Sequence, residues 1–193
     1  PVLAQDTLKI TVTGTRSERS VEDIPASIEV FDLEDLREKG STDLKSITRY
    51  EPGVSVVDPR TNNYGGAAST GNLNIRGMSN NRVLSLQDNI RLPQGFYGVG
   101  YDYSNANTVD YFTLKTIDIL KGPASSLYGS DALGGVVSFN TLTVDDILEE
   151  GETIKYEFPA KLNSANSSLS GAARVAYRDE ETGISYLAVL SQS

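Results

Sequence analysis

The chain has 193 residues, and its 17 Lys and Arg against 26 Asp and Glu give a formal net charge of −9. This acidic balance argues against a nucleic-acid surface built on phosphate contacts. The sequence contains no cysteine and no histidine, which removes disulfides, thiolate sites, and the commonest general base and metal ligand. We therefore predict no catalytic residue and no metal site. No apolar run approaches the roughly 18 to 20 residues of a membrane-spanning helix, so any contact with a membrane is expected to use β-structure.

Two short patterns occupy residues 1–15. Pro1–Gln5 resembles the end of a secretory signal peptide, with the small residue Ala4 before the expected cleavage point. In Asp6–Thr13 polar and apolar residues alternate, which predicts a short edge strand.

Two short helices are expected next. Asp32 is predicted to cap the first, which ends at Lys39-Gly40. Ser41 or Thr42 begins the second helix. Its two apolar residues, Leu44 and Ile47, lie at helical spacing and should face a core.

Two polar stretches are expected to be loops. Residues 58–72 are rich in Asn, Gly, Ser and Thr and have no apolar period. Residues 93–112 form the second loop and concentrate aromatic side chains, whose polar tips suit ligand contact at a wet surface. Packing of the same rings onto the underlying sheet is the open alternative. The predicted ligand-binding residues are Phe96, Tyr97, Tyr101 and Tyr103.

The stretch Leu114–Asn140 predicts a strand, a Gly-Pro turn, a short helix and a second strand. Alternation over residues 117–121 suits a strand with one drier face. Pro123 is expected at the first helical position and Gly129 directly after the helix.

The C-terminal part predicts β-structure after a short acidic linker, residues 142–152, with one helical turn. Three strands are expected, over Thr153–Leu162, Ser167–Arg178 and Gly183–Gln192. In the middle strand, apolar residues share one face while Ser and Arg occupy the other, as in the wall of an outer-membrane barrel. A soluble β-meander is the alternative. Because an open sheet edge cannot sit in hydrocarbon, we expect the rest of a barrel of about 22 strands to be missing from this sequence.

Several segments resemble the plug domain of TonB-dependent outer-membrane receptors. The strongest is Ile117–Thr141, IDILKGPASSLYGSDALGGVVSFNT, which follows the family pattern of an (R/K)GP turn, an LYG segment and a GG pair. The other matching segments are Thr13–Arg16, Val21–Phe31, Tyr50–Val56, Leu73–Gly77 and Arg82–Arg91. The resemblance implies an α+β fold. A plug domain over residues 16–141, with a small mixed β-sheet and short helices, would precede the first three antiparallel strands of a truncated transmembrane β-barrel over residues 153–193.

The resemblance also implies roles for individual residues. The family's TonB box is a mobile periplasmic strand that the energy-coupling protein TonB captures by β-strand addition. Arg76 and Lys121 stand where the family's basic residues contact barrel carboxylates and seat the plug, although lysine lacks the bidentate fork of arginine. The implied location is the outer membrane, with a periplasmic N-terminus. The TonB-binding residues would be Asp6, Thr7, Leu8, Lys9, Ile10, Thr11 and Val12.

The resemblance implies uptake of an iron-containing ligand without covalent chemistry. Thr141–Gly151 is most similar to receptors for haem or haemoglobin, so haem is the expected transported ligand, and no intrinsic cofactor is expected. Receptors of that branch commonly use a plug histidine, which this chain lacks; Tyr97, Tyr101 or Tyr103 can replace it, because tyrosinate ligates ferric haem. A ferric siderophore is the alternative ligand.

Two other classes of function are alternatives for this sequence. An isolated plug would act as a periplasmic protein-binding module through its N-terminal strand. A phosphate-binding loop at Gly122–Gly135 is discounted, because it lacks the G-K-(S/T) ending and a long following helix.

Overall fold

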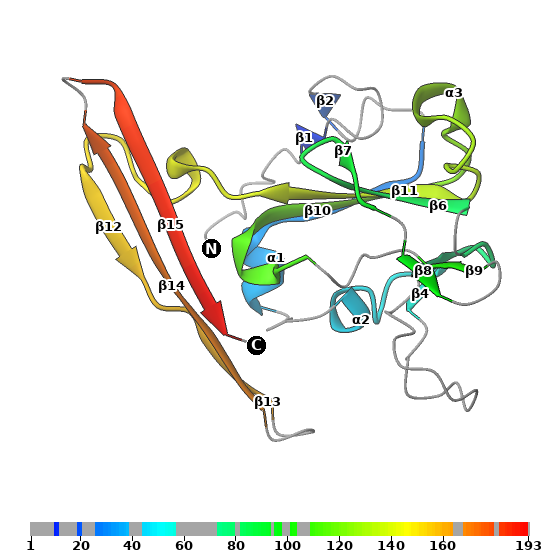
Figure 1. Ribbon diagram of the computed structural model, residues 1–193, viewed down its shortest axis with the longest axis horizontal. Coiled ribbons are helices and arrows are strands. Elements are labelled where there is room, and N and C mark those ends of the chain that lie inside the picture. Colours follow the sequence, from blue (N-terminus) through cyan, green and yellow to red (C-terminus); the bar gives the residue numbers. More distant parts are fainter. Residues whose placement is uncertain are drawn as a thin grey trace, which may run out of the picture.

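The computed structural model describes residues 10–11, 19–20, 26–38, 44–56, 73–79, 82–93, 95–97, 101–103, 109–163, 168–179 and 182–192. Figure 1 shows two parts, an α+β unit built on a central sheet and a second, slanted sheet formed by the C-terminal strands. No helix among these residues is long and apolar enough to cross a membrane.

The central sheet is mixed, as predicted, and has the strand order β3–β10–β11–β6–β7. Only β11 and β6 run parallel, and the other neighbours are antiparallel. The strands are β3 (Ile28–Phe31), β10 (Leu114–Lys121), β11 (Gly135–Thr141), β6 (Val83–Gln87) and β7 (Ile90–Arg91).

Both faces of β10 are covered, which corrects the expectation of one drier face. Ile117 and Ile119 are fully buried in a large core cluster on one face, and Leu120 belongs to a second cluster on the other. Asp118 is also buried, with 1% of its surface exposed, and accepts a hydrogen bond from Thr116 at 3.2 Å. The reason is position: β10 lies between β3 and β11, and helices cover the sheet on its two sides (Figure 1).

The first two helices agree with their predicted signals. Asp32 precedes α1 (Leu33–Glu38), and its carboxylate accepts the Asp35 N–H at 2.9 Å while Asp35 accepts the Asp32 N–H at 3.2 Å. This reciprocal pair is a capping box. In α2 (Leu44–Ile47), both predicted core residues are buried. The predicted Lys39-Gly40 end and the start at Ser41 or Thr42 lie outside the described residues.

The third helix begins later than predicted. α3 spans Ser125–Tyr128, with Ala124 as its N-cap, so Pro123 precedes the helix instead of opening it. The Ala124 N–H is bonded to the Ala132 carbonyl at 2.9 Å, which holds Ala124 at a non-helical φ of −126°. Gly129 ends the helix as predicted, at a φ of 88° that favours glycine.

Among the described residues, three two-stranded ladders complete this unit. One joins β4 (Val54–Val56) to β5 (Leu73–Ile75), and residues 58–72, predicted as a loop, lie outside the described part of the chain. The other two pair β1 (Ile10–Thr11) with β2 (Arg19–Ser20), and β8 (Gly95–Tyr97) with β9 (Tyr101–Tyr103).

The C-terminal sheet is antiparallel and centres on β14 (Ser168–Asp179), with β15 (Ile184–Gln192) along one side. The first predicted strand is divided in two, β12 (Ile154–Glu157) and β13 (Ala160–Asn163), which pair with the same side of β14. The register is unbroken across the gap, and the Pro159 carbonyl still accepts the Ala172 N–H at 2.9 Å. The strand divides because proline has no N–H for the ladder, and proline is tolerated on such an edge.

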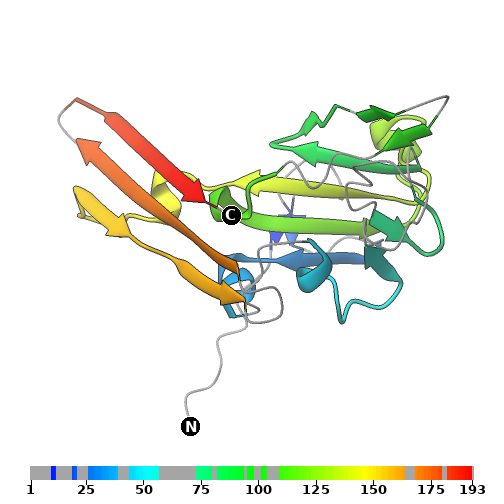
Figure 2. The same ribbon diagram turned by 60° about the horizontal axis from the view of Figure 1, so that its bottom comes forward.

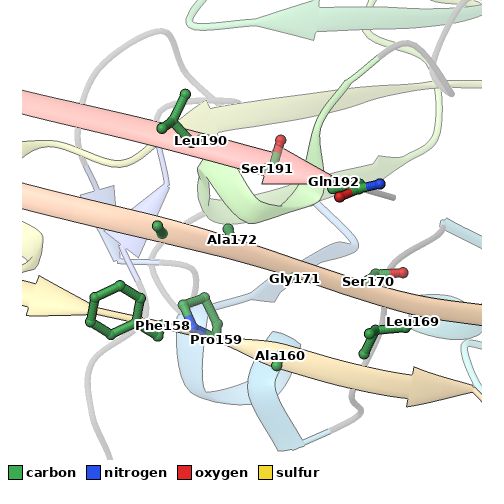
Figure 3. Close-up of a pocket in the computed structure, with 11 residues that line it drawn as sticks. Phe158, Pro159, Ala160, Leu169, Ser170, Gly171, Ala172, Leu190, Ser191 and Gln192 are labelled. Carbon is green, nitrogen blue, oxygen red and sulfur yellow. The ribbon is translucent and has the colours of Figure 1, made fainter.

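The two faces of this sheet differ as the alternation predicted. One face is apolar and exposed, and Figure 3 shows part of it, where Phe158, Leu169 and Leu190 surround a shallow hollow over Gly171. On the opposite face, Arg174 is 3% exposed and Ala176 is fully buried. The buried face is therefore the one turned toward the rest of the chain (Figure 2).

The acidic linker is a packed connection, and its predicted helical turn is present as the 3-10 turn η6 (Val144–Asp146). Ile147 and Leu148 are buried against Ala176 of β14, and Leu187 of β15 packs on the same cluster. The linker therefore fixes the C-terminal sheet to the central unit.

Candidate functional site

Three segments that are distant in the sequence meet at the C-terminal end of β10. Lys121 forms an ion pair with Glu51, which follows α2, and each side chain is only 11% exposed. Arg76 lies beside them: a Cβ placed at Gly122 would be 4.0 Å from its Nη1, and one placed at Gly53 would be 3.5 Å from its Cγ. We call Glu51, Gly53, Arg76, Lys121 and Gly122 the motif junction.

The local backbone explains how Arg76 reaches the motif junction. Arg76 and Gly77 have φ values of 51° and 85°, and Ile75 and Met78 exchange backbone hydrogen bonds of 2.8 and 2.9 Å. These values fit a tight turn with two left-handed central residues, in which glycine is favoured at the second. The Arg76 N–H also donates to the Gly53 carbonyl at 2.7 Å.

The structure thus brings the two predicted plug–barrel residues, Arg76 and Lys121, into one place. It pairs Lys121 with a carboxylate from the same unit, and a contact of either residue with a barrel carboxylate stays a prediction. Glu51 was missed by the sequence argument. Its signal is an acidic residue directly before Pro52-Gly53 in an otherwise apolar motif, but its partner lies 70 positions away.

The aromatic segment contains a hairpin where the sequence predicted only a loop. The β8–β9 register places Tyr97 opposite Tyr101 and Gly95 opposite Tyr103, with Phe96 opposite Asp102. We call the paired strands β8 and β9 the tyrosine hairpin. It lies at the end of the central sheet that is remote from the C-terminal strands in both views (Figures 1 and 2). The ligand contacts of its four aromatic residues stay a prediction.

Of the predicted TonB-binding residues, the structure describes the backbone of Ile10 and Thr11. They form β1, in register with Ser20 and Arg19 of β2. The remaining five lie outside the described residues: Asp6, Thr7, Leu8, Lys9 and Val12.

The linker carboxylates contact basic residues on both sides. Asp146 pairs with Lys115 of β10 at 2.5 Å, and Asp145 pairs with Arg178 of β14. Asp146 also accepts the Thr143 N–H at 2.8 Å and the Thr143 hydroxyl at 2.6 Å. Burial alone would raise the pKa of Asp146, but the hydrogen bonds from Lys115 and Thr143 and the charge of Lys115 together hold that pKa below its ordinary value of 3.8.

We expect the η6 turn to weaken in acid. Because the folded pKa of Asp146 is lowered, its stabilisation is present above pH 3.8 and is lost as the pH falls through the folded pKa. Hydrogen exchange of the Ile147 and Leu148 amides, corrected for intrinsic rates, should show protection that falls in this range. In Asp146→Asn the same protection should be lower at neutral pH and insensitive to acid. An equal acid response in both proteins would contradict the assignment.

A family model described as the TonB-dependent receptor plug domain matches residues 20–136. The chain belongs to this family. The match covers β3 to the start of β11 and includes the whole motif junction, so the central unit is the plug.

Curated relatives and solved structures agree with this membership. The hemin receptor of Yersinia enterocolitica is 29% identical over 180 residues, covering 93% of this chain and 24% of that protein. Transferrin-binding protein A of Haemophilus influenzae is 29% identical over 195 residues, covering 97% of this chain and 20% of that protein. A structure of the Serratia marcescens hemophore receptor HasR, in complex with hemophore HasA and heme, has a TM-score of 0.72 at 22% identity, covering 88% of this chain and 24% of that chain. The chain thus spans about a quarter or less of the length of these proteins.

The predicted fold class is confirmed. A plug with a mixed sheet and short helices is followed by antiparallel strands like those of the HasR structure, and the described strands do not form a closed barrel. We call β12 to β15 the wall strands.

Proposed function

We propose that this chain belongs to a TonB-dependent receptor of the outer membrane that takes up an iron-containing ligand, with haem preferred. Membership of the plug family supports the proposal that the protein is a transport receptor. The hemin receptors among the relatives and the resemblance of Thr141–Gly151 to haem receptors support the ligand. Transferrin-binding proteins and a vitamin B12 transporter match as well, so the preference for haem needs its own test.

The wall strands support a location in the outer membrane. Their exposed face carries large apolar side chains, including Tyr156 at 57% and Leu162 at 82% exposure, which would be costly in water and suit lipid. The β14–β15 connection is short and charged, as expected of a periplasmic turn. In this orientation the N-terminal segment would be open to TonB in the periplasm.

Energy coupling would start at the N-terminus. TonB would pair with residues 6–12 by strand addition, in which an extended segment is recognised through its backbone hydrogen bonds. Ile10 and Thr11 would take part from the edge of β1 that does not face β2. Ligand can promote this step only if its contacts differ between plug states. The tyrosine hairpin is the proposed place for those contacts.

The first test concerns ligand binding by the full-length receptor. If tyrosinate ligates the haem iron, the Tyr97→Phe/Tyr101→Phe double variant should bind haemin at least tenfold more weakly, and the haem absorption bands should shift. Tyr156→Phe is the matched control, because Tyr156 lies on the exposed face of β12. Unchanged haemin affinity and spectrum in the double variant would exclude the tyrosine proposal.

A ferric siderophore is the second candidate, because the chain has no histidine to ligate haem. Growth of an iron-starved strain that depends on this receptor, on haemin or on ferric siderophores as the sole iron source, separates the two ligands. Growth on either should require TonB. A receptor that supports no growth but still captures TonB in a pull-down, only when residues 1–13 are present, would instead be a protein-binding module.

A further inference from the structure

Arg174 is a buried cation on the inner face of the wall strands. Its side chain is 4% exposed, and its guanidinium donates from Nη1 to Glu157 at 3.1 Å. Glu157 is its register partner on β12, so this ion pair lies within the wall. The other two nitrogens reach out of the wall: Nε donates to the Phe112 carbonyl at 2.9 Å, and Nη2 donates to the same oxygen.

Phe112 belongs to a short turn of the plug, η5 (Tyr111–Thr113). Asp110 caps this turn by accepting the Phe112 N–H at 2.9 Å, and its other oxygen accepts the hydroxyl of Ser191 on β15. Two adjacent wall strands therefore hold the turn at neighbouring points, Arg174 on its carbonyl and Ser191 on its cap.

In the sequence, the turn lies between the tyrosine hairpin and β10. Val109 before it and Leu114 after it are both buried in the plug core. The Thr113 carbonyl accepts the Leu142 N–H at 2.8 Å, which links the turn to the start of the linker. The chain that leaves the tyrosine hairpin thus has its first described anchor at Val109–Thr113, and this anchor is docked on the wall.

We propose that Arg174 is a positioning residue that docks the η5 turn on the barrel wall and thereby sets the place of the tyrosine hairpin. The proposal rests on the proposed ligand role of that hairpin. The chemistry suits docking, because one planar guanidinium satisfies a wall carboxylate and a plug carbonyl at the same time. Moving the turn away would leave a buried guanidinium bonded on one side only, so the contact favours the docked arrangement.

Hydrogen exchange in the detergent-solubilised full-length receptor tests the docking without any ligand. The Thr113 and Leu114 amides are bonded inside the turn, to the Asp110 and Tyr111 carbonyls. Arg174→Met should raise their exchange rates at least tenfold. Arg174→Lys keeps the charge but not the fork, and it should restore part of the protection. Arg178→Met is the control: Arg178 lies on the same strand and face and contacts the linker residue Asp145, so the η5 amides should keep their wild-type rates.

Haemin binding to the same variants tests positioning. Arg174→Met should weaken haemin affinity about fivefold or more, and Arg178→Met should change it less than twofold. Unchanged η5 exchange in Arg174→Met, or equal effects of both variants, would overturn the docking role. Faster exchange with unchanged haemin affinity would overturn the link to the hairpin. A wild-type receptor that binds no haemin would instead refute the haem proposal, and the exchange data would still decide the docking.

Discussion

Replacing Lys121 by methionine is expected to destabilise the plug by about 3 kcal/mol or more, because it leaves the almost buried carboxylate of Glu51 without its cation. Removal of one member of a buried pair costs more than the pair contributes, since the remaining charge has lost its water and its partner. The measurement is native-state hydrogen exchange of the β10 and β11 amides in the full-length receptor. A loss this large should appear as roughly a hundredfold faster opening.

The double variant Glu51→Met/Lys121→Met is the matched control. It removes both charges and leaves apolar side chains of similar reach, so it should recover most of the lost protection. If the double variant is no more stable than Lys121→Met, the two charges are not coupled as the structure indicates. If Lys121→Met itself costs less than about 1 kcal/mol, the pair behaves as an exposed one.

Gly135→Ala is expected to have the second large effect. A Cβ at Gly135 would lie 2.3 Å from the Leu120 carbonyl oxygen and 2.7 Å from Ile75 Cδ1. The isoleucine side chain can turn away, but the carbonyl belongs to the β10–β11 ladder and cannot. Overpacking of this kind costs about 1 to 3 kcal/mol, and more when the backbone must shift. Exchange of the β11 amides should therefore accelerate strongly, and folding of the plug should be impaired.

Gly171→Ala provides the comparison. At this position on β14 the added Cβ would lie 3.4 Å from the Pro159 carbonyl oxygen, an ordinary contact. We expect a change below about 0.5 kcal/mol, as for most surface substitutions. Equal behaviour of the two alanine variants would show that close approach at Gly135 is not what requires glycine there.

Local signals were sufficient to predict much of the fold. The Asp32 cap, the Gly129 helix end and the alternating faces of β14 all depend on residues within one element. Family motifs then located the plug. What depends on a neighbour was not predicted: the parallel β11–β6 pairing and the burial of Asp118 on the second face of β10 follow from where strands lie in the sheet.

The candidate site was predicted in the same uneven way. Arg76 and Lys121 were found from motifs, but Glu51 was not, because an ion pair across 70 positions has no local pattern. The alternation in β14 placed Arg174 on the correct face. Its main partner is the backbone carbonyl of Phe112, which no sequence pattern could single out because every residue has a backbone carbonyl. The tyrosine hairpin was predicted as loop because Gly98 and Gly100 interrupt the alternation of its two short strands.

The position of β3 at one end of the sheet has a mechanical consequence. β3 is held to β10 by only four register pairs, and a pull from the N-terminal side would reach its first residue, Ile28, before any other strand of the sheet. A pull directed across the sheet would peel this edge strand one bond at a time, whereas a pull along the strand would load the whole ladder at once. The first bond in its way joins the Lys121 N–H to the Ser27 carbonyl, next to the Lys121–Glu51 pair. Tension on the N-terminus would therefore be felt first at the motif junction, while the β10–β11 ladder still holds.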